Sequence, residues 1–248
     1  MDFLVYAAVT HQGTVKAINE DCVVARAPVF LVADGISGCQ RGALASGMVA
    51  ERFGELVGRT DLTPELVTDT VEDVHAHVRR SQQESNHRAA TTIAAAVAVR
   101  IGGQPYWCLV NAGDSRIYRV TGQRRRMIQV TEDHTHVQGM LALGLLTPEQ
   151  AAHHPERNVL TQAVGSADHF DPDYWLLPMV AGERLLICSD GLLHETDPAD
   201  VEGIVLGPNT PQDAVVELLS LALTSGARDN VSVVIVDVDE ASWRRENS

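Results

Sequence analysis

The stretch Val32-Ala33-Asp34-Gly35-Ile36-Ser37-Gly38 places one carboxylate between an apolar run and a glycine-containing turn. The run Val29–Ala33 predicts a buried strand, and the two glycines predict a sharp turn directly after it. Burying Asp34 at such an edge is costly unless a cation shares its charge. Gly35 would also let backbone carbonyls approach whatever the carboxylate binds. The stretch therefore indicates a strand end and a cation site together.

Three further segments place an aspartate at the edge of an apolar run. They are Leu185-Leu186-Ile187-Cys188-Ser189-Asp190-Gly191, Ala112-Gly113-Asp114-Ser115-Arg116 and Asp229-Asn230-Val231. Any one of these acids could be an ordinary turn residue, but four of them indicate one shared site for hard divalent cations, which prefer oxygen ligands. Two such ions, about 3.5–4 Å apart across a bridging carboxylate, make hydroxide available from water at neutral pH. This arrangement suits in-line attack on a phosphate ester, because the ions also neutralise the phosphoryl oxygens.

The composition argues against nucleic acid as the main partner, because a formal charge of −14 over 248 residues provides no basic face for phosphates. The hydrophobic content of 45% is enough for a substantial core. No apolar stretch is long enough to span a bilayer, and residues 1–4 lack the pattern of a signal peptide. The cysteines lack close pairing, which suits reduced thiols. We therefore expect a cytoplasmic protein with no membrane contact.

The apolar patterns fall into groups of strands interrupted by groups of helices. Strands are predicted at 3–10, 22–25, 29–33, 92–99, 106–110, 116–120, 127–130, 184–188 and 231–238. Helices are predicted at about 42–57, from Thr63-Pro64 onward, at 147–150 and at about 211–224. This order fits an α+β fold of antiparallel sheets with helices on their outer faces. We expect one domain, 1–240, with an excursion at about 133–165 and a polar, frayed tail at 241–248.

Several motifs occur in a fixed order between residues 13 and 238. They are Gly13-Thr14-Val15-Lys16-Ala17-Ile18-Asn19-Glu20-Asp21, Val32-Ala33-Asp34-Gly35 with Gly42, Ala45 and Ser46 after it, Thr91-Thr92, Asn111-Ala112-Gly113-Asp114-Ser115-Arg116, Thr131-Glu132-Asp133-His134-Thr135, Asn158-Val159-Leu160-Thr161-Gln162-Ala163-Val164-Gly165, Cys188-Ser189-Asp190-Gly191 and Asp229-Asn230-Val231-Ser232. In this order they resemble the metal-dependent type 2C (PPM) serine/threonine protein phosphatases, closest to the short bacterial forms. The resemblance covers nearly the whole chain.

The resemblance implies a four-layer α-β-β-α sandwich, in which two antiparallel sheets are flanked by helix pairs. It also implies that the excursion at 133–165 is a flap beside the catalytic cleft. The implied activity is hydrolysis of phosphoserine and phosphothreonine esters in proteins, through a water that bridges two Mg²⁺ or Mn²⁺ ions. A serine/threonine kinase would be the functional counterpart of such an enzyme, and we expect a monomer.

The resemblance also assigns roles at matching positions. Asp34 would bridge the two ions, with Asp190 and Asp229 completing the first metal site. Gly35 would lend its carbonyl to the second ion, and Asp114 would belong with Asp190 to a weaker third site. The remaining matching residues are Asp21 and Glu20, which would hold metal-bound waters, and Asn230, which would orient its neighbour or the substrate.

Two residues depart from the family pattern. Lys16, the only lysine in the chain, stands where an arginine usually clamps the substrate phosphate, and it offers a point charge in place of a bidentate fork. Cys39 stands where bacterial members usually carry a histidine. A thiol is the poorer acid near neutral pH, so His134, His154 or metal-bound water would protonate the leaving group. We expect slower turnover of phosphoserine than of aryl phosphates.

The same residues bear on two other classes of phosphatase and on a non-enzymatic function. A cysteine-based phosphatase needs an arginine just after its nucleophile, and the segment after Cys188 has none. Asp171-Pro172-Asp173 could indicate an aspartyl-phosphate enzyme, but it follows no apolar strand and favours a turn. A catalytically weak or inactive relative that binds phosphoproteins as a regulatory module remains the alternative, because Lys16 and Cys39 leave it open.

Overall fold

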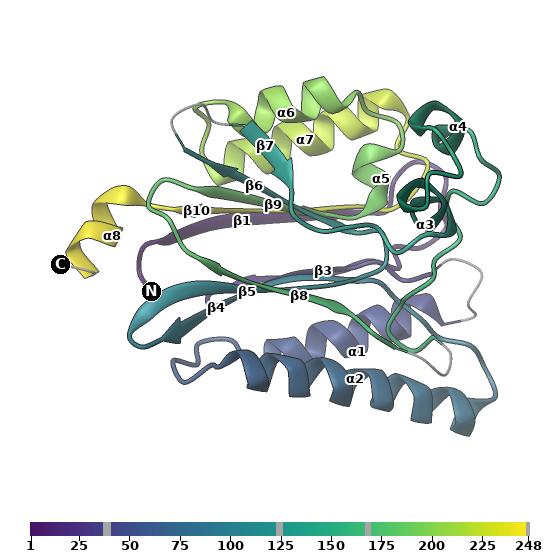
Figure 1. The fold of residues 1–248 in the computed structure, drawn as a ribbon, viewed down its shortest axis with the longest axis horizontal. Helices are drawn as coiled ribbons and strands as arrows, with labels where there is room; N and C mark the ends of the chain where they lie inside the picture. Colours follow the sequence, from purple (N-terminus) through teal and green to yellow (C-terminus); the bar gives the residue numbers. More distant parts are fainter. Residues whose placement is uncertain (37–40, 123–125, 167–169, 247–248) are drawn as a thin grey trace.

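The computed structural model describes residues 1–36, 41–122, 126–166 and 170–246, and these ranges form two five-stranded antiparallel sheets (Figure 1). Sheet A has the spatial order β1 (Leu4–His11), β10 (Val231–Val238), β9 (Arg184–Cys188), β6 (Arg116–Thr121) and β7 (Arg126–Gln129). Sheet B has the spatial order β2 (Cys22–Arg26), β3 (Val29–Ala33), β4 (Ile93–Ile101), β5 (Gln104–Ala112) and β8 (Asp173–Pro178). The strands predicted from apolar runs are confirmed.

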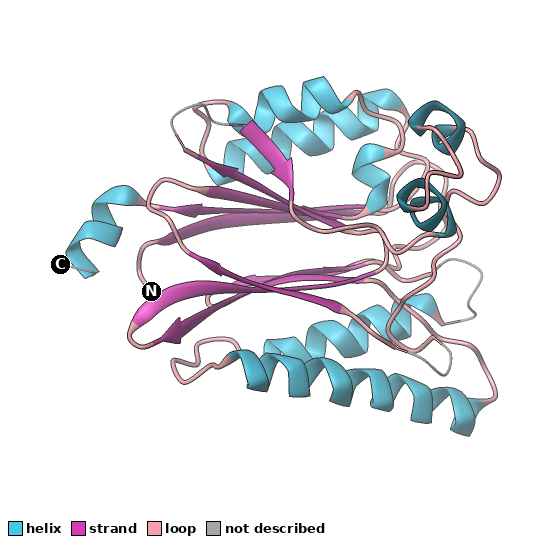
Figure 2. Ribbon diagram, viewed as in Figure 1, coloured by secondary structure: helices cyan, strands magenta, loops and turns pink. Residues whose placement is uncertain are grey.

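Helices cover the outer face of each sheet, so the predicted α-β-β-α sandwich is confirmed (Figure 2). Sheet B carries α1 (Gly42–Gly54) and α2 (Pro64–Ser85). Sheet A carries α5 (Asp190–Leu193), α6 (Pro198–Leu206) and α7 (Pro211–Ser225). Among the described residues, no helix combines the length and the apolar character needed to cross a membrane.

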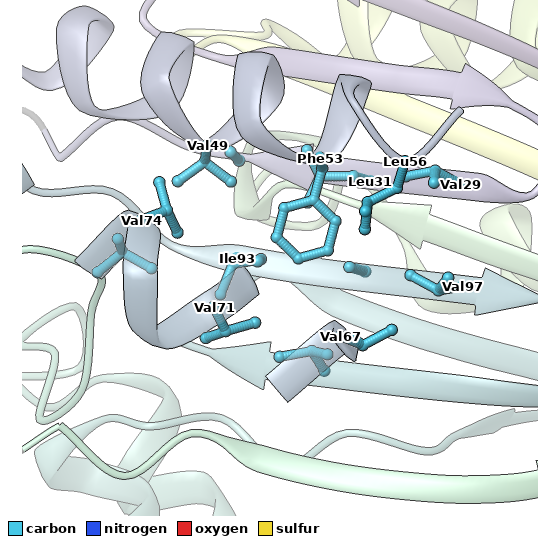
Figure 3. Close-up of a cluster of buried hydrophobic side chains, with 14 of the residues drawn as sticks. Val29, Leu31, Val49, Phe53, Leu56, Val67, Val71, Val74, Ile93 and Val97 are labelled. Atoms are coloured by element: carbon cyan, nitrogen blue, oxygen red, sulfur yellow. The ribbon is translucent and has the colours of Figure 1, made fainter. Parts of the chain in front are cut away.

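The helix layer on sheet B follows from the valine spacing of α2. Thr63 caps this helix by accepting the Leu66 N–H at 3.3 Å, which stabilises a helix by about 1 kcal/mol. Its Val67, Val71, Val74 and Val78 recur at helical spacing and form one fully buried stripe. Figure 3 shows Val67, Val71 and Val74 beside Val49 and Phe53 of α1, over the strands of sheet B.

The layer between the two sheets is held by aromatic side chains. Phe30 of sheet B meets Trp107 edge-on with ring centroids 6.0 Å apart, and Tyr6 of sheet A meets Phe30 at 5.1 Å. At one end of this layer, Trp243 packs edge-on against Phe3 at 4.9 Å. Trp243 belongs to α8 (Glu240–Glu246), so most of the segment expected to be a frayed tail is a helix anchored on the core.

Strand β8 and helix α6 also differ from the sequence predictions. The segment Asp171-Pro172-Asp173, which favoured a turn, leads into the unpredicted strand β8 at the edge of sheet B. Its side chains alternate between partly buried and exposed, so it lacks the continuous apolar run of a central strand. Helix α6 was also missed, although Asp197 caps it and Pro198 occupies its first turn.

One end of the sandwich gathers the segments that carry the predicted site. β3, β5 and β9 end there, and β10 begins there (Figure 1). The short helices α3 (His136–Ala142) and α4 (Pro148–Ala152) lie beyond the sheets at the same end. Thr147 and Gln150 form a capping box at the start of α4, where a helix was predicted. The excursion at 133–165 therefore lies next to the ends of the strands.

Candidate active site

A cavity of about 440 Å³ opens at this end of the sandwich, and four of the predicted aspartates line it. Asp34 follows β3, Asp114 follows β5, Asp190 follows β9 as the first residue of α5, and Asp229 precedes β10. Segments far apart in the sequence thus meet because both sheets end together. The other lining residues are Ile36, Thr92, Asn158, Leu160, Thr161, Gln162, Ala163, Ser166 and His194.

Asp34 occupies the centre of this charge cluster. Burial and the charges of Asp21, Asp190, Asp114 and Asp229 raise its pKa well above the ordinary value. Four carboxylates acting on a fifth create a strongly negative site, which a divalent cation would stabilise.

The backbone of Asp34 is held in place by two threonines. The Asp34 N–H donates to Thr92 Oγ1 at 3.0 Å, while Thr91 Oγ1 donates to the Asp34 carbonyl at 2.8 Å. The Thr92 N–H donates to the same carbonyl, also at 2.8 Å. These bonds fix the central carboxylate on the rigid end of sheet B.

The pKa values of the neighbouring carboxylates are also raised. Burial raises the pKa of Asp21 to about 6, although hydrogen bonds from Ser232 and Ser189 oppose the shift. Burial and the charges of Asp190 and Asp133 raise the pKa of Asp114 to about 8. Burial raises the pKa of Asp190 as well, and the positive charges of His194 and Lys16 oppose this. Perturbed acids gathered in one cavity are typical of a functional site.

Two glycines allow the segments of the site to approach closely. A Cβ at Gly35 would lie 2.6 Å from the Glu20 carbonyl oxygen and 2.6 Å from the Gly42 carbonyl carbon. A Cβ at Gly191 would lie 1.9 Å from the Asn230 carbonyl oxygen. Both contacts are too close for any side chain, so glycine is required where the chain packs behind the carboxylates.

Lys16 is outside the cavity lining and lines a neighbouring pocket that shares Asp229 and His194 with the cavity. Its Nζ is 2.7 Å from Asp229 Oδ1. Partial burial lowers the pKa of Lys16, but the hydrogen bond and charge of Asp229, with the charges of Asp34 and Glu20, raise it overall. The lysine therefore stays protonated. The structure brings Lys16 together with three of the predicted acids.

Asn230 holds the segment that carries Lys16 and Glu20. Its Oδ1 accepts the Glu20 N–H at 2.9 Å, and its Nδ2 donates to the carbonyls of Gln12 at 2.8 Å and Ile18 at 3.0 Å. The side chain therefore binds the backbone of residues 12–20, while the Asn230 N–H donates to Oδ1 of its neighbour Asp229 at 2.8 Å. The side chain positions that loop. That Asn230 orients its neighbour or the substrate stays a prediction.

The histidines expected as acids lie elsewhere. His134 Nδ1 faces the Gly113 N–H at 3.3 Å and its Nε2 faces Asp173 at 3.2 Å, so both ring nitrogens bind protein groups outside the cavity lining. His154 Nδ1 accepts the Glu156 N–H near α4. The imidazole that does line the cavity is His194, 3.5 Å from Asp190. Its position four residues after Asp190, on one face of α5, was the sequence signal for it. Cys39 lies outside the described residues.

The cysteine-based alternative is excluded by burial as well as by sequence. Cys188 is fully buried on β9, and burial raises the pKa of its thiol to about 12. A thiol in that state is not a nucleophile at neutral pH.

The carboxylates fit a hard divalent cation. Asp21 Oδ1 is buried and has no hydrogen-bond partner, so this atom is available to a cation or to a water held by one. Within the described ranges, no three histidine, cysteine, aspartate or glutamate side chains form a cluster that would enclose an ion by themselves. Mg²⁺ and similar ions keep several waters and use only one or two carboxylates directly, so an open group of acids is compatible with such a site.

The α-β-β-α sandwich and the aspartates gathered in one cavity at its end agree with what the motif resemblance implies. The chain belongs to the protein phosphatase 2C family, whose model matches residues 16–206. PhpP of Streptococcus pneumoniae is 30% identical over 247 residues, which cover 93% of this chain and 96% of PhpP. The family assignment made from the motifs is confirmed.

Solved structures agree with this assignment. The phosphatase PstP of Mycobacterium tuberculosis superposes with a TM-score of 0.85 at 30% identity, covering 95% of this chain and 99% of the solved one. A PstP catalytic domain in complex with two manganese ions superposes with a TM-score of 0.82 at 29% identity, covering 95% and 98%. The full PstP sequence is longer, and this chain spans 45% of its length.

Proposed function

We propose that this chain is a Mg²⁺- or Mn²⁺-dependent phosphatase that hydrolyses phosphoserine and phosphothreonine esters in proteins. The observation that carries the proposal is the buried Asp34, on whose carboxylate the charges of Asp21, Asp114, Asp190 and Asp229 act, with Lys16 bound to Asp229. The manganese ions in the PstP catalytic domain support the choice of metal. The family to which the chain belongs supports the choice of reaction.

The carboxylates hold the metal ions. Asp34 would be shared by two ions, Asp190 and Asp229 would hold the first of them with it, and the Gly35 carbonyl would hold the second. Asp21 and Glu20 act through waters, for which the buried and unpartnered Asp21 Oδ1 is suited. Asp114, beside Asp190 in the cavity lining, belongs with it to a weaker third site. When bound, the ions supply positive charge to the phosphoryl oxygens and make a water nucleophilic at neutral pH.

Lys16 binds the substrate phosphate. Its protonated Nζ lies beside Asp229 of the cavity lining, so a phosphate that enters near the carboxylates meets a fixed positive charge. Such a charge-assisted hydrogen bond also strengthens as negative charge develops on the phosphoryl oxygens. Asn230 supports this function by fixing the loop of residues 12–20.

The substrates are proteins phosphorylated by a serine/threonine kinase, whose products the enzyme returns to the unmodified state. We further propose that the enzyme acts in the cytoplasm as a monomer. Three of its cysteines, Cys22, Cys108 and Cys188, are free thiols, which suits a reducing compartment.

Phosphate release from a phosphothreonine peptide and from p-nitrophenyl phosphate, each with and without Mn²⁺, tests the proposal. The wild type is expected to hydrolyse both substrates only with the metal, and Asp34→Ala and Asp190→Ala are expected to lose that activity. Asp69→Asn, which changes an exposed acid on α2, is the control and keeps it. Equal turnover in wild type and Asp34→Ala, or none in the wild type, would contradict the proposal; the second result would favour a phosphoprotein-binding module.

A further inference from the structure

Helix α2 contacts the wall of the catalytic cavity through one imidazole. The Gly165 N–H donates to Nδ1 of His75 at 3.1 Å. The His75 ring also stacks on Phe170, with centroids 4.1 Å apart and planes at 10°. Gly165 comes directly before Ser166 and two residues after Ala163, and both of these residues line the cavity of Asp34. His75 therefore binds a cavity wall without entering the cavity.

Three side chains of helix α2 fix the position of Gly165. Its φ of +82° is one that glycine adopts readily, and a Cβ there would lie 2.4 Å from Val78 Cγ1 of α2. Its carbonyl accepts the Gln82 Nε2 at 2.5 Å, while its N–H binds His75. Both backbone polar groups of Gly165 are thus satisfied by side chains of α2.

The contacts continue from Gly165 to the central carboxylate. Its neighbour Val164 exchanges two backbone hydrogen bonds with Thr91, at 2.9 and 3.1 Å. Thr91 Oγ1 in turn donates to the Asp34 carbonyl at 2.8 Å. An unbroken series of hydrogen bonds and peptide bonds therefore joins His75 to the backbone of Asp34.

We propose that His75 is a positioning residue for Asp34, and that its neutral imidazole forms an acid-sensitive latch between α2 and the cavity wall. The inference rests on the proposed function, because the group that it positions is the proposed metal-bridging carboxylate. The latch itself is a property of the fold and can be tested without activity.

Protonation of His75 breaks its hydrogen bond with the Gly165 N–H, because the protonated ring has no acceptor nitrogen. Nδ1 accepts the Gly165 N–H only while it carries no proton, and in the imidazolium two N–H donors would face each other. Burial, with the charge of Arg79, lowers the pKa of His75 below its ordinary value of 6.5. Among the described residues, Arg79 on α2 is the charged group that acts on the ring, and the two residues that contact it from the opposite loop, Phe170 and Gly165, are uncharged. Asp168 and His169 of that loop lie outside the described residues. The latch is therefore closed at neutral pH and opens below pH 6.5.

A nuclear magnetic resonance titration tests the latch directly. In Mg²⁺-loaded protein labelled with ¹⁵N-glycine, the Gly165 amide resonance is expected to shift as the pH falls from about 7.5 to about 5.5, with a midpoint below 6.5. The shift should disappear in His75→Phe, which keeps an aromatic ring beside Phe170 but has no acceptor. It should persist in His77→Phe, a matched change at an exposed position of the same helix. The proposal would be overturned if the Gly165 amide resonance of the wild type did not shift with pH. It would also be overturned if the resonance shifted equally in His75→Phe.

Kinetics test the positioning role. At pH 7.5 the kcat of His75→Phe for p-nitrophenyl phosphate should fall roughly two- to thirtyfold with little change in KM, as expected for a residue that acts through others. His77→Phe should match the wild type. His75→Asn, whose amide oxygen can accept the Gly165 N–H and does not titrate in this range, should recover part of the loss. An unchanged kcat in His75→Phe would overturn the positioning role, whereas inactivity of every form would refute the proposed function and leave the resonance test decisive for the latch.

Discussion

Lys16 Nζ lies 2.7 Å from Asp229 Oδ1, which joins the loop before β2 to the segment before β10. These residues are more than two hundred positions apart in the sequence, and Asn230 holds the same loop from the same side. The only lysine of the chain is therefore fixed beside Asp229 of the acid-lined cavity, in its protonated form.

Replacing Lys16 tests its role in phosphate binding. Lys16→Ala should raise the KM for a phosphothreonine peptide about tenfold, because a charge-assisted hydrogen bond to the phosphate is lost, and should change kcat less. Lys16→Arg should lower KM below the wild-type value, since the guanidinium can bind phosphate through two hydrogen bonds. Steady-state kinetics on the three forms check this, and unchanged KM in Lys16→Ala would remove Lys16 from the site.

Asn230→Ala should loosen the loop of residues 12–20. The Glu20 N–H and the carbonyls of Gln12 and Ile18 lose their partner, and a buried donor left unsatisfied costs about 1–3 kcal/mol. Urea denaturation should show this loss, and the KM for phosphopeptide should rise because Lys16 is no longer fixed. Wild-type stability in Asn230→Ala would mean that the loop is held by its other contacts alone.

One glycine substitution should disrupt the protein, and another should stabilise it. Gly191→Ala places a methyl group 1.9 Å from the Asn230 carbonyl oxygen, so it should displace the start of α5 and abolish activity. Gly47→Ala adds a methyl group with nothing within 4 Å in the middle of α1, and should stabilise the protein by about 0.5–1 kcal/mol. Thermal unfolding and phosphatase assays on both variants measure these effects. Retained activity in Gly191→Ala would show that this contact can relax.

The raised carboxylate pKa values predict how stability depends on pH and metal. Asp34 and Asp114 bind protons more readily in the folded chain than in the unfolded one, where the ordinary value is 3.8. Their protonation therefore favours folding, and this contribution is lost as the pH rises through the folded pKa, about 8 for Asp114. Without metal, the melting temperature should fall by roughly 2–4 °C between pH 6.5 and pH 8.5.

Differential scanning calorimetry of metal-free protein checks this fall of the melting temperature with pH. Mn²⁺ should raise the melting temperature more at the higher pH, because it binds the deprotonated carboxylates. In Asp114→Asn, the melting temperature of the metal-free protein should depend less on pH. A melting temperature that rises with pH over this range would contradict the assigned direction.

Much of the fold was predictable because local signals agreed with tertiary packing. The valine stripe of α2, its Thr63 cap and the glycine turn between β4 and β5 each specify one structure. Strand β8 was not predictable in the same way, since it is an edge strand whose half-exposed side chains are held by pairing with β5. The pairing is non-local, so a short segment does not reveal it.

The acids of the site were predictable because each one marks a strand end, and strand ends meet at one edge of the sandwich. The histidines were not. His134 and His194 both lie near such acids in the sequence, but only α5 turns its histidine back toward the cavity, next to Asp190. The role of Asn230 also required the structure, because its partners lie more than two hundred residues away.

Isothermal titration of Mn²⁺ into the wild type and into Asp34→Asn tests the central claim most directly. If the charge cluster of carboxylates holds a metal pair centred on Asp34, the wild type should bind two ions, and Asp34→Asn should bind them at least roughly tenfold more weakly. Asp69→Asn should behave as the wild type. Equal binding by wild type and Asp34→Asn, or no binding by the wild type, would contradict the account.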